Sequence, residues 1–518
     1  MRRVRTLLLT LGVALGLVLG LGLTWLPLPA NASTARDLDR GTARVTDRGT
    51  ARVTDRGGDQ LTDRDATRVP GRRVAGPVTV TSGTQFTDTT GGLVHAHGGG
   101  VLKVGAWYYW FGENRNADNS FRYVSAYRSS DLKNWEFRKH VLTQATAPEL
   151  ADANIERPKV VYNATTRQFV MWMHKESATD YSQARAAVAT SSTVDGDYTW
   201  KGSFRPLDVH MSRDITLFTD TDGTGYMVSA ARENYDLQIY RLTADYTAIA
   251  GLVANPWPGG HREAPALFKR NGVYFMLTSG ATGWSANQQQ YATATSVAGP
   301  WSAMRNVGDS TTYNSQTTYV LPVQGTSGTS YLYMGDRWGN SFGRTVNDSR
   351  YVWLPLAFPT TTSMTMNWYP EVTIDTTAGT VSGSGGPYET LTARHSGKCA
   401  DVPGQSILEG AALSQYACNG GGNQRFWFKN TGDGYVWLMG RQSSLCLTET
   451  AADVQQQACG GASAQQWKVT ATSGGYVTLT ARASGECLDV SAASTADSAR
   501  LITYTCSGAT NQQWQRAA

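Results

Sequence analysis

The sequence predicts an all-β protein in which a five-bladed β-propeller is followed by a β-trefoil. Three observations lead to this fold class. The 518 residues include 24 Tyr, 16 Trp and 54 Gly, a composition typical of strands joined by tight turns. Aromatic strand segments recur five times through the middle of the chain, and a pattern of Cys and Trp recurs three times near its end. No long apolar stretch has the periodicity of a large helix.

Residues 1–32 are predicted to be a signal peptide. Three arginines precede an uncharged apolar run from Leu7 to Leu26, and an Ala-Asn-Ala sequence suited to cleavage ends at Ala32. The run is long for a signal peptide, so an uncleaved membrane anchor is the alternative. Both interpretations place the folded part outside the cytoplasm. We therefore expect a secreted, extracellular protein without membrane association after cleavage.

Residues 33–77 are predicted to be a disordered linker. The eight-residue unit Asp-Arg-Gly-Thr-Ala-Arg-Val-Thr repeats from Asp39 to Arg56 and then decays. Its mixed charge and scarcity of large apolar residues leave little to offset chain entropy, although a wall-binding role is an alternative. The net positive charge of the linker and the signal peptide together exceeds the +5 of the whole chain, so the rest of the chain is slightly negative. A nucleic-acid partner therefore has no electrostatic support.

Residues 78–385 contain the five repeated strand segments of the predicted propeller. Each segment follows a turn signal, and successive segments lie roughly 50 to 60 residues apart, which suits one four-stranded blade each. The segments are 107–111, 169–173, 226–229, 273–277 and 331–334.

Residues 386–518 contain the three shorter repeats of the predicted trefoil. None of these units can bury a core alone, so we expect them to pack around a pseudo-threefold axis with the tryptophans of their Gln-x-Trp motifs at the centre. All six cysteines lie here, and an even number in an exported domain indicates disulfides instead of metal ligands. The spacing within each repeat fits the pairs Cys399 with Cys418, Cys446 with Cys459 and Cys487 with Cys506.

The C-terminal pattern resembles the ricin-type β-trefoil of carbohydrate-binding module family 13. In that family a sugar is held by an Asp after the first Cys, an aromatic residue before the second Cys and an Asn ahead of the Gln-x-Trp motif. Thr448, Gln457 and Ala464 replace these residues in the middle repeat, so we expect no sugar site there. A purely structural trefoil is the alternative. The matching residues are Asp401, Tyr416 and Asn423 in the first repeat and Asp489, Tyr504 and Asn511 in the third.

The predicted propeller resembles glycoside hydrolase family 43, and most closely its exo-β-1,3-galactanase subfamily, across residues 85–380. The resemblance implies a secreted, inverting exo-glycosidase that releases galactose from β-1,3-galactan, the backbone of arabinogalactan proteins, while the trefoil anchors it to polysaccharide. We expect a monomer without a cofactor. The motifs that carry the resemblance are His95 to Gly100, Trp110 to Glu113, Ile155 to Lys159, Ser212 to Thr216, Arg262 to Pro265, Thr278 to Trp284, and Ser315 with Gln316.

Two carboxylates match the acid machinery of that family. Glu263 matches the general acid, which must be protonated beside the leaving oxygen. Asp214 matches the carboxylate that raises the pKa of the acid, because two neighbouring carboxylates resist being charged together. The alternatives are ion pairs of Glu263 with Arg262 and of Asp214 with Arg213.

The third catalytic position departs from most of the family. The stretch from Gly91 to His97 lacks the Asp that serves as general base there, and the galactanase subfamily shares this absence. In the subfamily a Gln is proposed to hold the attacking water, and Gln316 stands at the matching place. An ordinary hydrogen-bonding role for Gln316, or compensation by Glu156 or Glu113, is the alternative.

Further residues match the substrate pocket of the subfamily. Glu156 and Glu113 match carboxylates that bind hydroxyls of the terminal galactose. Trp284 is the candidate stacking platform, with a core position as the alternative. Tyr181, Asn234 and Thr282 lie in or beside the matching segments.

No metal site is expected. The Asp-Thr-Asp-Gly sequence beginning at Asp220 lacks the downstream acidic ligand of a calcium loop and is better interpreted as a hairpin turn. His95 and His97 have metal-like spacing but no third ligand, which favours hydrogen bonding near the propeller axis. Tyr313 and Asp336 receive no role.

Two other functions remain open at this point. An arabinofuranosidase or xylosidase would keep the fold and change the sugar, but most such family members carry the Asp that is missing here. A non-catalytic carbohydrate-binding protein would need neither carboxylate, and the presence of Glu263 and Asp214 argues against it.

Overall fold

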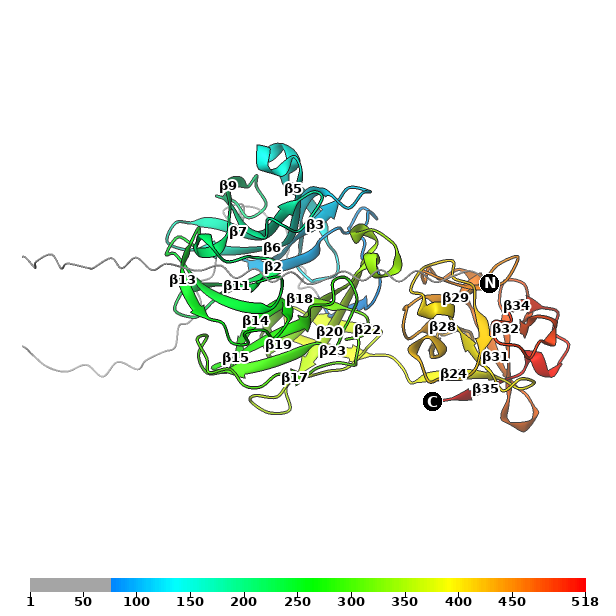
Figure 1. Ribbon diagram of the computed structural model, residues 1–518. Coiled ribbons are helices and arrows are strands. Elements are labelled where there is room, and N and C mark those ends of the chain that lie inside the picture. Colours follow the sequence, from blue (N-terminus) through cyan, green and yellow to red (C-terminus); the bar gives the residue numbers. More distant parts are fainter. Residues whose placement is uncertain (1–75) are drawn as a thin grey trace, which may run out of the picture. The chain divides into compact units, whose positions relative to one another are not determined.

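The computed structural model describes residues 76–518, so the predicted signal peptide and nearly all of the predicted linker lie outside the described residues. Strands and short 3-10 turns make up the regular structure of the described part, which contains no α-helix (Figure 1). The all-β prediction is therefore confirmed for these residues. Within them, no helix has the length and apolar character needed to cross a bilayer.

Five four-stranded antiparallel sheets follow one another along the chain. The first comprises β2 (His97–Val104), β3 (Trp107–Arg115), β4 (Phe121–Ser129) and β5 (Glu136–Thr143). The second comprises β6 (Ala153–Asn163), β7 (Gln168–Ser177), β8 (Arg185–Ser191) and β9 (Thr199–Phe204). The third comprises β10 (Ile215–Thr219), β11 (Gly225–Ala231), β12 (Asp236–Leu242) and β13 (Ile249–Ala254).

The remaining two sheets have the same order. The fourth comprises β14 (Arg262–Arg270), β15 (Val273–Gly280), β16 (Gln290–Ala294) and β17 (Arg305–Asn306). The fifth comprises β18 (Gln316–Gly325), β19 (Gly328–Arg337), β20 (Arg350–Ala357) and β21 (Thr365–Met366). The 3-10 turns between these strands are η1 (Gln144–Thr146), η2 (Pro148–Leu150), η3 (Pro206–Asp208), η4 (Gly339–Phe342) and η5 (Val346–Asp348).

The first strands of the five sheets form a closed ring. Each first strand contacts the first strand of the next sheet, and β18 of the fifth sheet contacts β2 of the first. Figure 1 shows β2, β6, β14 and β18 together in the middle of the five sheets. The five predicted aromatic segments are the second strands β3, β7, β11, β15 and β19, whose buried faces pack between neighbouring sheets.

A separate three-stranded sheet ties the two ends of this region together. The strand β1 (Val78–Thr81) pairs with β22 (Glu371–Asp375), which also pairs with β23 (Thr380–Ser384). Val78 lies opposite Ile374 in the antiparallel register, so this sheet pairs strands that are nearly 300 residues apart in the sequence.

Bulges interrupt the first strands close to their starts. The pairing register shifts directly after His97 in β2, after Glu156 in β6 and after Glu263 in β14. The first residue inside each shift has a positive φ: 62° at Gly98, 53° at Arg157 and 51° at Ala264. A bulge of this kind leaves one residue unpaired and re-aims the side chain beside it. The bulges thus turn residues near the strand starts towards the space inside the ring.

The C-terminal region is a twelve-stranded arrangement of three similar units. Its strands are β24 (Tyr388–Ala393), β25 (Cys399–Asp401), β26 (Ser414–Tyr416), β27 (Phe426–Asn430), β28 (Val436–Gly440), β29 (Cys446–Glu449), β30 (Val454–Gln457), β31 (Trp467–Ala471), β32 (Val477–Ala481), β33 (Cys487–Val490), β34 (Leu501–Tyr504) and β35 (Trp514–Ala517). Its 3-10 turns are η6 (Pro403–Gln405), η7 (Gly422–Gln424), η8 (Ser463–Gln465), η9 (Ser473–Gly475), η10 (Ser491–Ala493) and η11 (Thr510–Gln512).

One disulfide staples each unit, with the pairing that the spacing predicts: Cys399–Cys418, Cys446–Cys459 and Cys487–Cys506. Trp467 and Trp514 are fully buried in the shared core, as expected. The expectation for the first repeat needs a correction, because Phe426 and not Trp427 fills the core position. Both central tryptophans stand two residues after a Gln, and in the first repeat the residue two positions after Gln424 is Phe426.

Candidate active site

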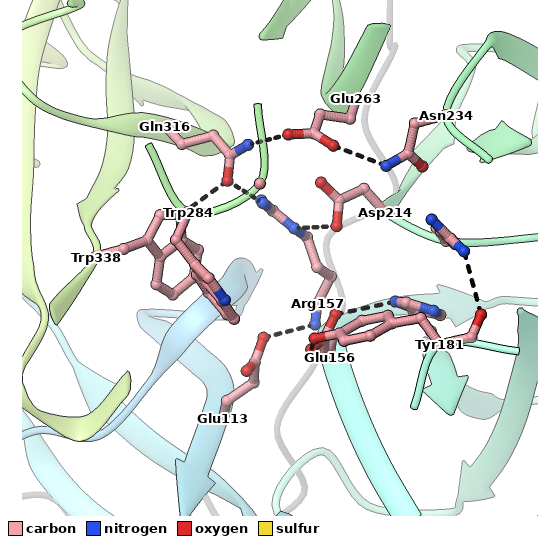
Figure 2. Close-up of a pocket in the computed structure, with 13 residues that line it drawn as sticks. Glu113, Glu156, Arg157, Tyr181, Asp214, Asn234, Glu263, Trp284, Gln316 and Trp338 are labelled. Carbon is pink, nitrogen blue, oxygen red and sulfur yellow. Dashed lines mark hydrogen bonds and ion pairs between the residues drawn. The ribbon is translucent and has the colours of Figure 1, made fainter. Parts of the chain in front are cut away.

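A cavity of about 220 Å³ opens where the starts of the first strands converge. Figure 2 shows the side chains around it, which come from all five sheets or from the loops beside them. Of the nine propeller residues predicted from the sequence, the cavity is lined by Glu113, Glu156, Tyr181, Asp214, Asn234, Glu263, Trp284 and Gln316.

Thr282 is the predicted residue whose side chain does not line the cavity. Its hydroxyl donates to the Ser285 carbonyl oxygen at 2.6 Å and accepts from Asn287 Nδ2 at 2.6 Å, which stabilises its own loop. The contribution of Thr282 to the site is made by its backbone, which hydrogen-bonds to Glu263.

Glu263 is held as an uncharged acid with its proton available. Its side chain is buried, and Oε1 accepts from Gln316 Nε2 at 3.0 Å while Oε2 accepts from Asn234 Nδ2 at 2.9 Å. Burial and the negative charge of Asp214 raise the pKa of Glu263 to about 8. Since both amide partners are donors, the acid proton has no acceptor among them and remains free for a ligand. Neighbouring Arg262 donates to Thr278 instead, so the two do not form an ion pair.

Arg157 connects three of the predicted residues. Its Nε donates to Asp214 Oδ1 at 2.9 Å, and one terminal nitrogen donates to Gln316 Oε1 at 2.6 Å. Its backbone N–H donates to Glu113 Oε1 at 2.9 Å (Figure 2). Asp214 also accepts from the backbone N–H of Ala264 at 3.0 Å, the residue after the acid. Asp214 is therefore paired with Arg157 and not with Arg213, and it is fixed beside Glu263.

The Gln316 side chain uses every hydrogen-bonding position that it has. Its Oε1 accepts from Arg157 and from Trp338 Nε1 at 2.8 Å, and its Nε2 donates to Glu263 and to Ser279 Oγ at 2.9 Å. Arg and Trp can only donate, so the oxygen must face them and the amide orientation is unambiguous.

Glu113 and Glu156 lie on the opposite wall and share Arg115. The Arg115 guanidinium donates to Glu113 Oε2 at 2.7 Å and to Glu156 Oε1 at 2.8 Å. Burial, only partly offset by Arg115, raises the pKa of Glu113. Burial also opposes ionisation of Glu156, but the hydrogen bond from His174 and the charge of Arg115 hold its pKa well below the ordinary value. Glu156 is thus the firmly ionised member of this pair.

Aromatic residues complete the cavity. The Tyr181 hydroxyl donates to Glu156 Oε1 at 2.7 Å, and the guanidinium of Arg213 lies 5.9 Å from the Tyr181 ring centre. Trp284 is partly exposed and packs edge-on against Trp338, with ring centres 5.2 Å apart. Trp284 therefore borders the cavity, as a sugar platform requires, and is not a core residue.

Several lining residues were not singled out from the sequence. Arg157, His174, Arg213 and Trp338 all border the cavity. Arg157 lies in the motif from Ile155 to Lys159, and its positive charge next to Glu156 was the feature from which a role in the site could have been predicted. His174 ends an apolar strand segment, where a polar residue was the only hint.

Two of the features considered as metal sites have other contacts, whereas His95 Nδ1 is buried without a hydrogen-bond partner among the described residues. His97 Nδ1 lies 2.9 Å from Asp336 Oδ1, and its ring stacks on Tyr351. The turn after Asp220 joins β10 and β11 as a hairpin. Tyr313 donates to the Met366 carbonyl oxygen and does not line the cavity.

The two predicted trefoil sites have matching geometry. Asn423 Nδ2 donates to Asp401 Oδ2 at 2.9 Å, and Asn511 Nδ2 donates to Asp489 Oδ2 at 2.8 Å. Burial raises the pKa of both carboxyl groups. The rings of Tyr416 and Tyr504 are exposed, by 42% and 60%, and are free to stack on a ligand. In the middle repeat the Thr448 hydroxyl accepts from Gln465 at 3.3 Å, without a carboxylate.

Both regions match known families. Residues 98–340 match the glycosyl hydrolases family 43, and residues 387–514 match the ricin-type β-trefoil lectin domain. Among curated proteins, no significant match to this chain was found.

The structure is similar to solved structures of galactan-degrading enzymes. An exo-β-1,3-galactanase from Clostridium thermocellum is 46% identical over 85% of this chain and 99% of that chain, with a TM-score of 0.60. An exo-β-1,3-galactanase variant from Phanerochaete chrysosporium, solved with β-1,3-galactotriose, is 29% identical over 85% of this chain and 93% of that chain, with a TM-score of 0.60. A family 43 β-1,3-galactosidase solved with galactodeoxynojirimycin is 34% identical over 56% of this chain and 99% of that chain, with a TM-score of 0.51.

Proposed function

Because this chain belongs to glycosyl hydrolase family 43 and carries a ricin-type β-trefoil, we propose that it is an inverting exo-glycosidase that releases galactose from β-1,3-galactan. The substrate follows from the similar exo-β-1,3-galactanases, one of which was solved with β-1,3-galactotriose. The five four-stranded sheets are the blades of a five-bladed propeller, a proposal supported by the contacts that close the ring of first strands.

The observation that carries this proposal is the state of Glu263. Hydrolysis needs a carboxyl that is protonated near neutral pH and can pass its proton to the bridging oxygen. Burial and Asp214 raise the pKa of Glu263 to about 8, and its two amide partners leave the proton without an internal acceptor. Glu263 is the general acid, and Asp214 adds to the effect of burial in keeping it protonated.

The opposite wall binds the terminal sugar. Glu156 and Glu113 accept hydroxyl hydrogens, since Glu156 Oε2 and Glu113 Oε1 each receive a single internal donor and keep one lone pair. A cavity of about 220 Å³ suits one sugar unit at a chain end, which supports exo action. Tyr181, Asn234 and Trp284 complete the walls, and the backbone of Thr282 supports the acid.

Gln316 hydrogen-bonds to both Glu263 and Arg157, which fixes these two side chains relative to each other. It is also the candidate that positions the attacking water. Its oxygen already accepts from Arg157 and Trp338, so holding a water through this oxygen requires one of those contacts to be exchanged when substrate binds. Gln316→Ala separates the two roles. Loss of water positioning removes turnover at every pH, whereas loss of support for Glu263 alone moves the alkaline limb of the pH profile.

The trefoil anchors the enzyme to its polymer through the sites at Asp401 and Asp489. Two weak sites on one domain raise the effective concentration of chain ends near the catalytic cavity. The apolar N-terminal segment and the three disulfides support an extracellular location. We further propose that the protein acts as a monomer.

The decisive experiment is incubation with debranched β-1,3-galactan, followed by identification of the released sugar and its first-formed anomer by NMR. Free galactose in the α-form supports the proposal, and release of only arabinose or xylose from other polymers refutes it. Glu263→Gln is expected to abolish hydrolysis while retention on galactan persists. Glu149→Gln, at a residue outside the cavity, is the matched control and is expected to hydrolyse normally.

A further inference from the structure

A buried line of alternating charges runs from the cavity wall into the second sheet. His174 lies opposite Glu156 in the register of β6 and β7, and Glu176 follows two residues later on the same face of β7. His174 Nδ1 lies 3.0 Å from Glu156 Oε2, and His174 Nε2 lies 2.8 Å from Glu176 Oε1. Both His174 and Glu176 are excluded from solvent, with side-chain exposures of 1% and 0%.

This geometry requires a doubly protonated imidazole. Each ring nitrogen faces a carboxylate oxygen, so a neutral ring would direct a lone pair at one of the two anions. Burial lowers the pKa of His174, but its hydrogen bonds to Glu156 and Glu176 outweigh burial and raise the pKa to about 9. Glu176 is itself fixed, because its other oxygen accepts from the backbone N–H of Ala184 at 2.8 Å.

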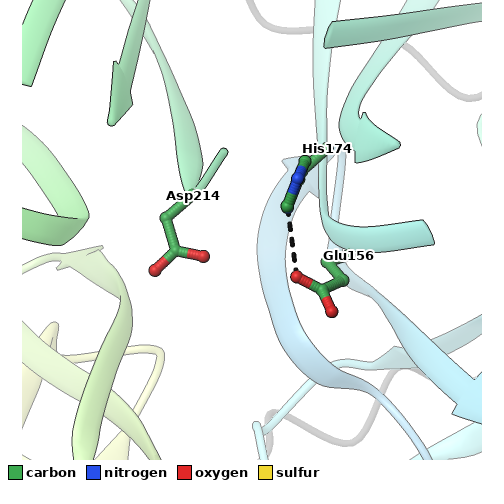
Figure 3. A group of neighbouring side chains, drawn as sticks. All are labelled: Glu156, His174 and Asp214. Atoms are coloured by element: carbon green, nitrogen blue, oxygen red, sulfur yellow. Dashed lines mark hydrogen bonds and ion pairs between the residues drawn. The ribbon is translucent and has the colours of Figure 1, made fainter. Parts of the chain in front are cut away.

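The imidazolium determines how Glu156 faces the cavity. Arg115 and Tyr181 donate to Oε1, and His174 is the donor that the structure places on Oε2. The carboxylate is thereby held in one orientation, with one lone pair of Oε2 left for a ligand. Figure 3 shows the Asp214 side chain on the side opposite Glu156 and His174.

The same three side chains could be mistaken for a metal site. Atoms of Glu156, His174 and Asp214 lie within 4.8 Å of one another. A metal ligand needs a free imidazole lone pair, however, and both nitrogens of His174 are committed to carboxylates. A proton on each ring nitrogen of His174 therefore occupies the lone pair that a metal ion would need.

We propose that His174 and Glu176 are positioning residues that hold Glu156 as an oriented anion for a hydroxyl group of the terminal sugar. The inference rests on the proposed function, because the sugar is the ligand of that function. The charged and titratable groups that face this pair are Glu156 on β6, Arg115 and Glu113 on β3, Tyr181 after β7, and Asp214 before β10.

The first test measures the charge of His174 without using activity. In the full-length protein labelled with ¹⁵N-histidine, one of seven histidines is assigned by comparison with His174→Asn. Both ring nitrogens are expected to carry protons at pH 7 and to titrate near pH 9. A neutral ring at pH 7, or resonances that shift when Zn²⁺ is added, overturns the proposal. This result is independent of whether galactan is the substrate.

The second test separates positioning from a structural role. Glu176→Gln removes the remote charge and leaves Glu156 in place, so we expect the His174 titration to move to lower pH. We also expect KM for β-1,3-galactobiose to rise about tenfold while kcat changes less than about threefold, since the oriented hydroxyl contact is lost in the ground state and the transition state alike. Unchanged KM in a folded Glu176→Gln protein overturns the proposal.

A graded series provides the rescue control. His174→Asn keeps a donor near the Nδ1 position and is expected to retain a lower KM than His174→Ala, which keeps none. His140→Asn changes a half-buried histidine that stacks on Tyr123 outside the cavity, and it is expected to leave KM unchanged. Equal KM values for His174→Asn and His174→Ala, with thermal unfolding of both like that of the wild type, contradict positioning through Glu156.

Discussion

Replacing Asp214 by Asn tests how the acid is kept protonated. The substitution keeps an oxygen that can accept from Arg157 but removes the negative charge beside Glu263. Because that charge disfavours ionisation of Glu263, we expect the alkaline limb of the kcat/KM profile to move to lower pH.

The size of the displacement follows from the causes of the raised pKa. Raising the pKa of Glu263 from its ordinary value of 4.5 to about 8 corresponds to about 5 kcal/mol. Burial is the larger cause and Asp214 the second, so removing Asp214 is expected to eliminate only part of this effect. We expect the limb to move by about one pH unit, to near pH 7. With each protein normalised to its own acidic plateau, the activity of the variant is then about eightfold lower than that of the wild type at pH 8.5 but only about 10% lower at pH 6.

The assay is the initial rate of galactose release from β-1,3-galactobiose between pH 4 and pH 10. The position of the limb is compared, and not the absolute rate, because the Asn side chain also loses the acceptor for the Ala264 N–H. Asp222→Asn removes the same charge from an exposed turn of the third sheet and is expected to leave the limb unchanged. A limb that stays near pH 8 in Asp214→Asn, or moves to higher pH, would refute the reasoning.

Three further predictions concern other parts of the molecule. Arg157→Lys removes the guanidinium that bonds to both Asp214 and Gln316, so kcat is expected to fall at least about a hundredfold. Thermal unfolding, measured in parallel, shows whether the variant is folded. Combined Asp401→Ala and Asp489→Ala substitutions are expected to abolish retention on a galactan column, while each single substitution only weakens it and hydrolysis of the disaccharide is unchanged. Joint replacement of Cys446 and Cys459 by Ser is expected to destabilise the trefoil by about 3 kcal/mol in denaturant unfolding, and a loss below about 1 kcal/mol contradicts the model of a constrained unfolded chain.

The repeats made the architecture predictable from sequence. Five aromatic segments coincide with five second strands, because a strand buried between sheets needs large apolar side chains on both faces. Regular cysteine spacing likewise predicted the disulfides. The central residue of the first trefoil unit was misassigned because two aromatic residues, Phe426 and Trp427, are adjacent, and only the count from Gln424 shows which one faces inward.

The site was predictable where one residue does one chemical task. Glu263, Asp214 and Gln316, which line the cavity, could be picked out because each stands in its own motif. The connections between them were not, since Arg157 reaches Asp214 and Gln316 on different sheets only through its side chain and its positive φ. His174 escaped notice for a similar reason, as its importance arises from its two carboxylate neighbours.

The register shifts at Gly98, Arg157 and Ala264 have a consequence for how such a pocket can change over evolution. Each extra residue confines its distortion to the strand start, so the regular alternation beyond it continues to serve the packing between sheets. Substrate preference can therefore drift by point replacements beside a shift while the scaffold keeps its thermal tolerance. Deleting the extra residue would instead restore regular pairing and turn the side chain before the shift to the opposite face of its strand, so insertions and deletions should be rare at these points in functional descendants.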